Sequence, residues 1–403
     1  MITTADIEAA RARIRTSIYQ SPCALSETFS RVAENKIYLK LENLQMTGSF
    51  KERGALNKIL LLREGGDKTP GVMAASAGNH AQGVAYHATR QGIRARIFMP
   101  LTTPLIKVAA TKGYGAEVIL FGANYDEAFA EARAVCAAEG WTFIHPFDDE
   151  AIIAGQGTLG LEIIEQNPYL DAAIIPIGGG GLIGGVACAL KETNPKIKVI
   201  GVQTSRLPSM LAAVDGGRPV TLAPAQTIAD GIAVRRAGDL TLPLVQKYVD
   251  AIVTVDEEEI ANAILFLLER EKTLAEGAGA AGVAALLQHK TGLQGKKVVV
   301  VVCGGNIDVN FLARIIERGL VKDGRLVRLR IKIRDYPGSL HAVTGLLAET
   351  RANILSIVHD RAYYGVSLGE TAVEVTVETR GREHIDELAA RLAAANYSFE
   401  RVL

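Results

Sequence analysis

Short apolar runs alternate with longer alanine-rich or amphipathic segments along the first 320 residues. The runs have the length and β-branched content of buried strands, and the segments between them have helical periodicity. This alternation predicts βαβ units, and therefore parallel sheets with helices on both faces. The expected strands are residues 36–42, 71–76, 95–100, 116–122, 171–178, 198–204, 250–255 and 296–303.

The pattern changes near residue 320. Residues 319–325 read GLVKDGR and predict a linker, which we place at residues 321–324. The stretch that follows, LVRLRIKIRD, alternates strictly between apolar and charged side chains, as a half-buried strand does. The later elements predict a ferredoxin-like βαββαβ domain over residues 325–403, preceded by a first domain over residues 1–320.

Composition then excludes several classes of protein. The 403 residues carry 44 Lys+Arg and 44 Asp+Glu, so neither nucleic acid nor an anionic membrane is expected as a partner. The N-terminal residues lack the apolar core of a secretory signal, and the apolar runs are too short to span a membrane. The four cysteines are widely spaced without a CxxC pair, which argues against a disulfide framework or a zinc site and favours a cytoplasmic protein.

A glycine-rich turn follows one of the predicted strands. Residues 176–185 read PIGGGGLIGG, between an apolar strand and a helix. Glycines let backbone N–H groups wrap an anion, and a helix N-terminus adds partial positive charge, so a phosphate is the expected guest. The stretch also fits GxGxxG, but Gln203 stands where a dinucleotide-binding strand would carry an acid. Because the glycines fit, a nicotinamide-dependent oxidoreductase remains an alternative, although the missing acid argues against it.

Three further places combine small residues with candidate chemistry. In QMTGSFKERG, Lys51 follows Phe50 where a Gly/Ser turn opens a helix. Residues 75–83, ASAGNHAQG, form a second strand-to-helix turn that either caps the helix or binds a carboxylate. Cys303 ends a buried strand ahead of two glycines, and Glu276 is a lone acid among small residues.

Taken in order, the motifs SFKERGA, SAGNHAQG, GGGGL and CGGNID resemble those of the fold-type II enzymes that use pyridoxal phosphate. Within that superfamily the chain is similar to the threonine and serine dehydratases over most of residues 1–320. The resemblance implies two parallel-sheet α/β subdomains of the tryptophan-synthase-β-like fold, the smaller inserted at about residues 47–150. The C-terminal domain, with DYPGSL at its first turn, resembles an ACT domain.

This resemblance implies roles for individual residues. Lys51 would be the Schiff-base lysine that stores the cofactor aldehyde, with Phe50 near the cofactor ring. Asn79 would hydrogen-bond the 3-hydroxyl, Cys303 would face the pyridine nitrogen, and Glu276 would be a further cofactor contact. The residues expected at the cofactor phosphate are Gly178, Gly179, Gly180, Gly181 and Leu182. The residues expected at the substrate carboxylate are Ser76, Asn79 and His80.

The implied reaction is β-elimination, which converts L-threonine to 2-oxobutyrate and ammonia and, as a second reaction, L-serine to pyruvate. It would serve isoleucine biosynthesis or threonine catabolism. Serine racemases of this fold carry a second serine where this chain has Ala77, so we expect poor racemisation. Racemase-like members hold a divalent cation partly through a glutamate and an aspartate, and this chain has Gln203 and Ser209 at the matching positions. No divalent metal is therefore expected, and a monovalent ion remains an alternative. A serine racemase or serine dehydratase, or a regulatory binding protein with an inactive catalytic domain, remains an alternative.

The ACT-like domain implies allosteric control by an amino acid, with isoleucine first and valine second. Asp335, Gly338 and Asn353 match the ACT residues that border an effector. A structural dimerisation module is the alternative for this domain. Because ACT pockets form between subunits, we expect a homodimer or homotetramer.

Overall fold

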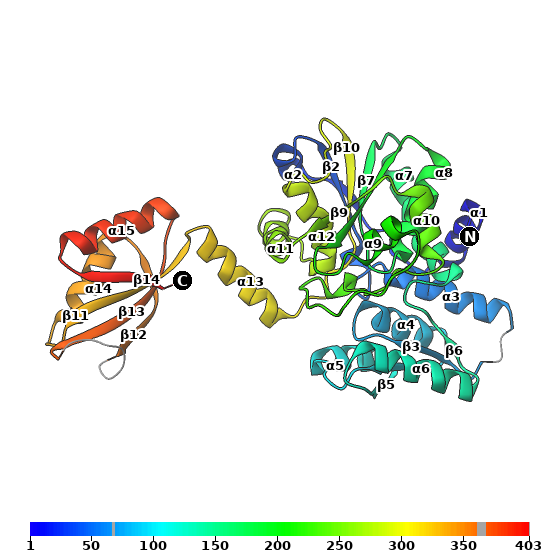
Figure 1. The fold of residues 1–403 in the computed structure, drawn as a ribbon, viewed down its shortest axis with the longest axis horizontal. Helices are drawn as coiled ribbons and strands as arrows, with labels where there is room; N and C mark the ends of the chain where they lie inside the picture. Colours follow the sequence, from blue (N-terminus) through cyan, green and yellow to red (C-terminus); the bar gives the residue numbers. More distant parts are fainter. Residues whose placement is uncertain (67–68, 361–367, 403) are drawn as a thin grey trace. The chain divides into compact units, whose positions relative to one another are not determined.

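The computed structural model describes residues 1–66, 69–360 and 368–402. The chain forms two compact units, Met1–Ile307 and Asp308–Leu403 (Figure 1). Among the described residues, no helix combines the length and the apolar character needed to cross a membrane. The predicted α/β fold class with an added C-terminal antiparallel unit is confirmed.

A six-stranded sheet forms the centre of the first unit, in the order β1-β2-β10-β7-β8-β9. All neighbours pair in parallel except β1 and β2. Every residue of β7 is buried, as are the five valines of β10, because helices cover both faces of the sheet. The strands are β1 (Cys23–Leu25), β2 (Lys36–Leu41), β7 (Ala172–Pro176), β8 (Lys198–Thr204), β9 (Ala251–Val255) and β10 (Lys297–Val302).

A smaller parallel sheet, in the order β5-β4-β3-β6, lies within the segment where the inserted subdomain is expected. Helices α4, α5 and α6 surround it (Figure 1), and its apolar core includes side chains from β3, β4 and α4. The strands are β3 (Val72–Ala75), β4 (Ala95–Met99), β5 (Glu117–Leu120) and β6 (Thr142–Phe143). All eight strands predicted for the first unit are present. β1 and β6 were not predicted, because runs of three and two residues carry too little periodicity.

The helices of the first unit follow the predicted alternation with the strands. They are α1 (Thr4–Ile14), α2 (Glu27–Val32), α3 (Lys51–Glu64), α4 (Asn79–Arg90), α5 (Leu105–Gly113), α6 (Tyr125–Glu139), α7 (Glu150–Gln166), α8 (Gly181–Thr193), α9 (Ser209–Gly216), α10 (Thr241–Tyr248), α11 (Glu257–Glu271) and α12 (Gly277–Leu287), with short 3-10 turns η1 (Glu42–Leu44) and η2 (Asp230–Ile232).

The second unit is a four-stranded antiparallel sheet, in the order β12-β13-β11-β14, with the predicted βαββαβ element order. In β11, Leu329 and Ile331 are buried while Arg328 and Lys332 are exposed, which is the alternation expected of a half-buried strand. The elements are β11 (Leu326–Arg334), α14 (Ser339–Glu349), β12 (Asn353–Asp360), β13 (Glu370–Glu378), α15 (Arg382–Ala394) and β14 (Ser398–Val402).

The division between the units lies earlier in the chain than residue 320. Helix α13 (Val309–Lys322) belongs to the second unit and contacts β11. Asp308 caps this helix, because its carboxylate accepts the backbone N–H groups of Asn310 and Phe311. The segment expected to be a linker, residues 321–324, is therefore the last residues of a helix and the turn that follows it.

Candidate functional site

The lysine turn and the CGGN turn lie side by side at the carboxyl end of β10. The Phe50 N–H donates to the Cys303 carbonyl at 3.1 Å, and the Gly305 N–H donates to the Gly48 carbonyl at 2.9 Å. Lys51 is the first residue of α3, so its side chain projects from a helix start that this pairing holds in place. Two of the predicted motifs, about 250 residues apart, thus form one site.

The Lys51 amine is enclosed by protein atoms. Its Nζ donates to the Pro146 carbonyl at 2.7 Å and lies 5.2 Å from the centre of the Phe50 ring. Burial lowers the pKa of Lys51 to about 8, even though Cys303 and Glu276 act in the opposite direction. A substantial share of the amine is therefore neutral near physiological pH, as a nucleophile or a base requires.

A chain of side-chain hydrogen bonds joins three of the motifs. The Asn79 amide donates to the Glu276 carboxyl at 2.6 Å, and the Asn306 amide donates to the Asn79 carbonyl oxygen at 2.8 Å. Asn306 also donates to the Thr47 carbonyl at 2.7 Å. Burial, with help from the nearby Asp230 charge, raises the pKa of Glu276 to about 8. The site therefore holds a neutral carboxylic acid at pH 7 that orients Asn79.

Cys303 lies directly after β10 and is buried. Burial raises the pKa of its thiol well above the ordinary value, and the Glu276 charge acts in the same direction. The thiol therefore stays protonated at neutral pH. A cofactor ring nitrogen placed against Cys303 would meet a neutral group, as the resemblance implies.

The four-glycine turn between β7 and α8 is shaped to hold an anion. Gly180 has φ +98°, and a Cβ on Gly179 would lie 2.4 Å from the Phe147 ring, so side chains are excluded at both positions. Within the described residues, no hydrogen bond uses the backbone N–H groups of Gly178 to Gly181. These free donors at the start of a 13-residue helix fit a phosphate group. Leu182, the next residue, is buried in the first turn of α8.

The second strand-to-helix turn follows β3. The Ser76 hydroxyl accepts the Gly78 N–H at 3.2 Å, and α4 begins at Asn79 without a side-chain cap. His80 is buried, and its Nε2 lies 2.9 Å from the Ile144 carbonyl. Burial lowers the pKa of His80 to about 3, so the ring is neutral and donates to that carbonyl. What His80 can offer a carboxylate is its backbone N–H group at the start of α4.

Sequence reasoning missed the segment that follows β6. Besides the Pro146 carbonyl that accepts Lys51 and the Phe147 ring on the glycine turn, it contains His145, whose Nδ1 accepts the N–H groups of Phe147 and Asp148. Burial lowers the pKa of His145 to about 4, so this acceptor is unprotonated at neutral pH. The signal available in the sequence was HPFDD, an unusual cluster of His, aromatic and acidic residues just after a strand.

The two positions matched to a racemase metal site are occupied by hydrogen-bonded neutral groups. The Gln203 amide oxygen accepts the N–H groups of Met210 and Leu211 at the start of α9. The Ser209 hydroxyl donates to the Val234 carbonyl at 2.6 Å. Among the described residues, no group of three or more His, Cys, Asp or Glu side chains could hold a metal ion.

Comparison with known proteins places this site in a family. Residues 14–304 match the model of the pyridoxal-phosphate-dependent enzymes, so the chain belongs to that family. It is 50% identical over 397 residues to an L-threonine ammonia-lyase of Thermotoga maritima, which covers 98% of each chain. Its structure is similar to that of threonine deaminase isoform 2 from Solanum lycopersicum (TM-score 0.74, 37% identity, 78% of this chain and 91% of that one). It is also similar to maize serine racemase (TM-score 0.74, 34% identity, 79% and 98%).

In the second unit, the expected effector residues lie at the ends of elements. The Asp335 N–H donates to the Gly369 carbonyl, Gly338 precedes α14 with φ +95°, and the Asn353 amide donates to Glu378. The Ser339 hydroxyl, in the first turn of α14, is buried and has no hydrogen-bond partner in the part of the chain that the structure describes. These positions therefore combine a helix start with an unsatisfied buried hydroxyl.

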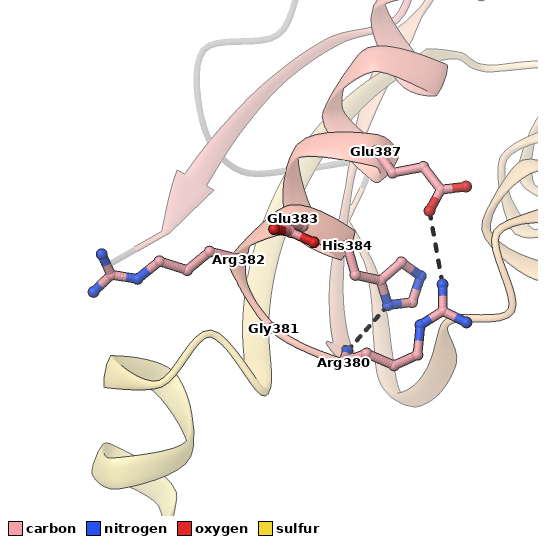
Figure 2. Close-up of a pocket in the computed structure, with 6 residues that line it drawn as sticks. All are labelled: Arg380, Gly381, Arg382, Glu383, His384 and Glu387. Carbon is pink, nitrogen blue, oxygen red and sulfur yellow. Dashed lines mark hydrogen bonds and ion pairs between the residues drawn. The ribbon is translucent and has the colours of Figure 1, made fainter.

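A separate cavity of about 450 Å³ lies at the start of α15 and contains none of the expected effector residues. Figure 2 shows that its charged groups face one another: Arg380 pairs with Glu387, and the Arg380 N–H donates to the His384 ring. Arg382 points away from this pair (Figure 2). Because its cations are balanced by carboxylates, we assign no ligand to this cavity. Its lining residues are Arg380, Gly381, Arg382, Glu383, His384 and Glu387.

Proposed function

We propose that this protein is an L-threonine ammonia-lyase that converts L-threonine to 2-oxobutyrate and ammonia. The observation that carries the proposal is a half-buried Lys51 amine whose pKa is lowered to about 8, in a site that also holds the hydrogen-bonded Asn79–Glu276 pair. The 50% identity with an L-threonine ammonia-lyase over nearly the whole chain supports the choice of substrate. The same family finding favours pyridoxal phosphate over a nicotinamide cofactor.

Residues of the chain fit the binding and proton-transfer parts of this reaction, and pyridoxal phosphate supplies the rest of the chemistry. The glycine turn would hold the cofactor phosphate, and Asn79, oriented by Glu276 and Asn306, would hydrogen-bond the cofactor ring. When bound, the cofactor makes the α-hydrogen of an attached amino acid acidic. The neutral Lys51 amine is the base that would take this proton, and the N–H groups at the start of α4 would hold the substrate carboxylate.

The direct test is a turnover assay of purified enzyme supplied with pyridoxal phosphate. L-threonine should yield 2-oxobutyrate and ammonia in equal amounts, and Lys51→Ala should lose this activity by orders of magnitude. L-serine should also yield pyruvate, because one methyl group in a pocket discriminates by only about 10–200-fold and therefore does not abolish turnover. If D-serine forms faster than pyruvate or 2-oxobutyrate, the enzyme is a racemase, and the proposal fails.

We further propose that the second unit binds an amino-acid effector, isoleucine or valine, and thereby changes the response to threonine. Gly338 precedes the first turn of α14, where unsatisfied backbone N–H groups attract a carboxylate, and the buried Ser339 hydroxyl lacks a partner among the described residues. An isoleucine effector would fit a role in isoleucine biosynthesis, and threonine catabolism is the alternative. We also expect a homodimer or homotetramer. All four cysteines are free, which supports a cytoplasmic enzyme.

Calorimetry of the full chain with isoleucine, valine and a control amino acid such as alanine tests the effector proposal. Binding of isoleucine should shift the threonine saturation curve, because an effector acts through its different affinities for two states, typically worth about 1–3 kcal/mol. Gly338→Val should abolish the shift and leave the catalytic constants without effector unchanged. If neither isoleucine nor valine binds or moves the curve, the second unit has only a structural role.

A further inference from the structure

The glycine turn is held from behind by a fully buried threonine. The Thr241 hydroxyl, at the start of α10, donates to the Gly179 carbonyl at 2.6 Å, and the Gly238 N–H donates to the same oxygen at 3.3 Å. A Cβ on Gly180 would lie 2.7 Å from the Thr241 Oγ1, so the two elements are in close contact. Both donors pull the Gly179 carbonyl toward α10.

This orientation determines which way the next N–H group points. In a trans peptide the carbonyl of one residue and the N–H of the next point in opposite directions. With the Gly179 carbonyl turned toward α10, the Gly180 N–H faces away from α10. Within the described residues that N–H has no acceptor. Thr241 therefore keeps a donor of the anion-binding turn available.

The start of α10 is itself fixed by the segment that contacts Lys51. The Asp148 carboxylate accepts the N–H of Leu240 at 2.9 Å and the N–H of Asp239 at 3.0 Å. Asp148 lies two residues after Pro146, whose carbonyl accepts the Lys51 amine. One short segment thus contacts the amine directly and reaches the glycine turn through α10.

We propose that Thr241 and Asp148 are positioning residues for the cofactor phosphate, acting through the Gly179 carbonyl. Thr241 holds that carbonyl, and Asp148 holds the helix start that carries Thr241. Neither side chain needs to contact the cofactor. The loss of either should weaken binding of the phosphate group specifically and leave recognition of the cofactor ring intact. The inference rests on the cofactor of the family and not on the choice of amino-acid substrate.

The test compares pyridoxal phosphate with pyridoxal, which lacks the phosphate, as ligands of the full-length apoenzyme. Dissociation constants are measured by absorbance for the wild type, Thr241→Val and Thr241→Ser. Thr241→Val should weaken pyridoxal phosphate binding by about three- to tenfold, the worth of one buried hydrogen bond, while pyridoxal binding changes by less than about twofold. Thr241→Ser keeps the hydroxyl and should therefore retain the wild-type preference for pyridoxal phosphate over pyridoxal.

Thr111→Val is the matched control, because Thr111 is equally buried and its hydroxyl also donates to a backbone carbonyl, that of Lys107. Asp148→Asn is an independent variant, in case Thr241→Val does not fold. It keeps one acceptor oxygen and should lower the preference for the phosphorylated ligand by about threefold. If both ligands weaken equally in each folded variant, or neither weakens, the proposal is overturned. An enzyme that binds cofactor but does not convert threonine refutes the proposed function and leaves this test intact.

Discussion

Replacing Arg53 by methionine removes one guanidinium that serves two buried carboxylates. Arg53 lies two residues after Lys51 and donates to both oxygens of Glu42, at 2.7 and 2.8 Å, and to Glu162 at 2.7 and 2.9 Å. Only 1% of Arg53 and none of Glu42 is exposed to solvent. Lys40 pairs with Glu162 at 2.7 Å and should keep that contact after the substitution, so Glu42 is the carboxylate left without a directly paired cation.

The expected loss of stability in Arg53→Met follows from the contacts that Glu42 retains. Glu42 would keep the Ser21 hydroxyl at 2.6 Å and the Gln45 amide at 3.2 Å, neither of which carries a charge. An uncompensated buried charge of this kind costs about 3–5 kcal/mol of unfolding free energy. The control, Arg11→Met, removes an ion pair with Glu165 whose side chains are 39% and 45% exposed, and should cost about 0–1 kcal/mol.

Urea unfolding followed by tryptophan fluorescence measures this difference. Trp141 is the single tryptophan of the chain and lies in the first unit, so its signal reports the unit that contains Arg53. The double variant Glu42→Gln, Arg53→Met should recover at least half of the unfolding free energy that Arg53→Met loses, because it removes the unpaired negative charge of Glu42. If Arg53→Met is no more destabilising than Arg11→Met at pH 7, the assignment of Arg53 as the cation that neutralises Glu42 is refuted.

The same variant should change how stability depends on pH. Burial alone would raise the pKa of Glu42, but the charge and hydrogen bonds of Arg53 hold it below the ordinary value. In the wild type this contributes stability above the ordinary glutamate pKa, which is lost as pH falls through the depressed value. In Arg53→Met, burial is opposed only by the Lys40 charge and the Ser21 hydrogen bond, so Glu42 takes up a proton more readily. The difference in unfolding free energy between Arg53→Met and the wild type should therefore become smaller as pH falls from 7 toward about 4.3.

The remaining predictions concern the cofactor site. Capture of pyridoxal phosphate by the apoenzyme should speed up with pH and level off above about 8, because only the neutral Lys51 amine reacts; a rate independent of pH between 6 and 9 would contradict the lowered pKa. Borohydride treatment of the loaded enzyme should attach the cofactor to Lys51, and mass spectrometry showing another lysine would move the site. L-serine should give pyruvate with little D-serine, and Ala77→Ser should raise the D-serine share in chiral chromatography; no rise would mean that a hydroxyl here is not the missing acid. Cys303→Ser should keep most activity, whereas Cys303→Asp should shift flux toward transamination; an inactive serine variant that still holds cofactor would contradict the role of a neutral partner.

Local patterns were enough to predict much of this molecule. The alternation of apolar runs and helical segments located all eight longer strands of the first unit, and the strict alternation in β11 distinguished a half-buried sheet in the second. Gly179 and Gly180, which have no room for a side chain, marked the turn that we propose to bind the cofactor phosphate. These features can be predicted locally because neighbouring residues determine both the periodicity of burial and the permitted backbone angles.

By itself, then, the sequence determined the order of the elements, the two-part organisation and the motifs that carry Lys51, Asn79 and the glycine turn. Only the tertiary structure decided that Asn306 orients Asn79 from 227 positions away, and that Thr241 holds the Gly179 carbonyl from 62 positions away. It also turned the His80 ring to the Ile144 carbonyl, and it placed helix α13 in the second unit. Such contacts depend on how distant segments pack against one another, and no periodicity or propensity of nearby residues encodes that packing.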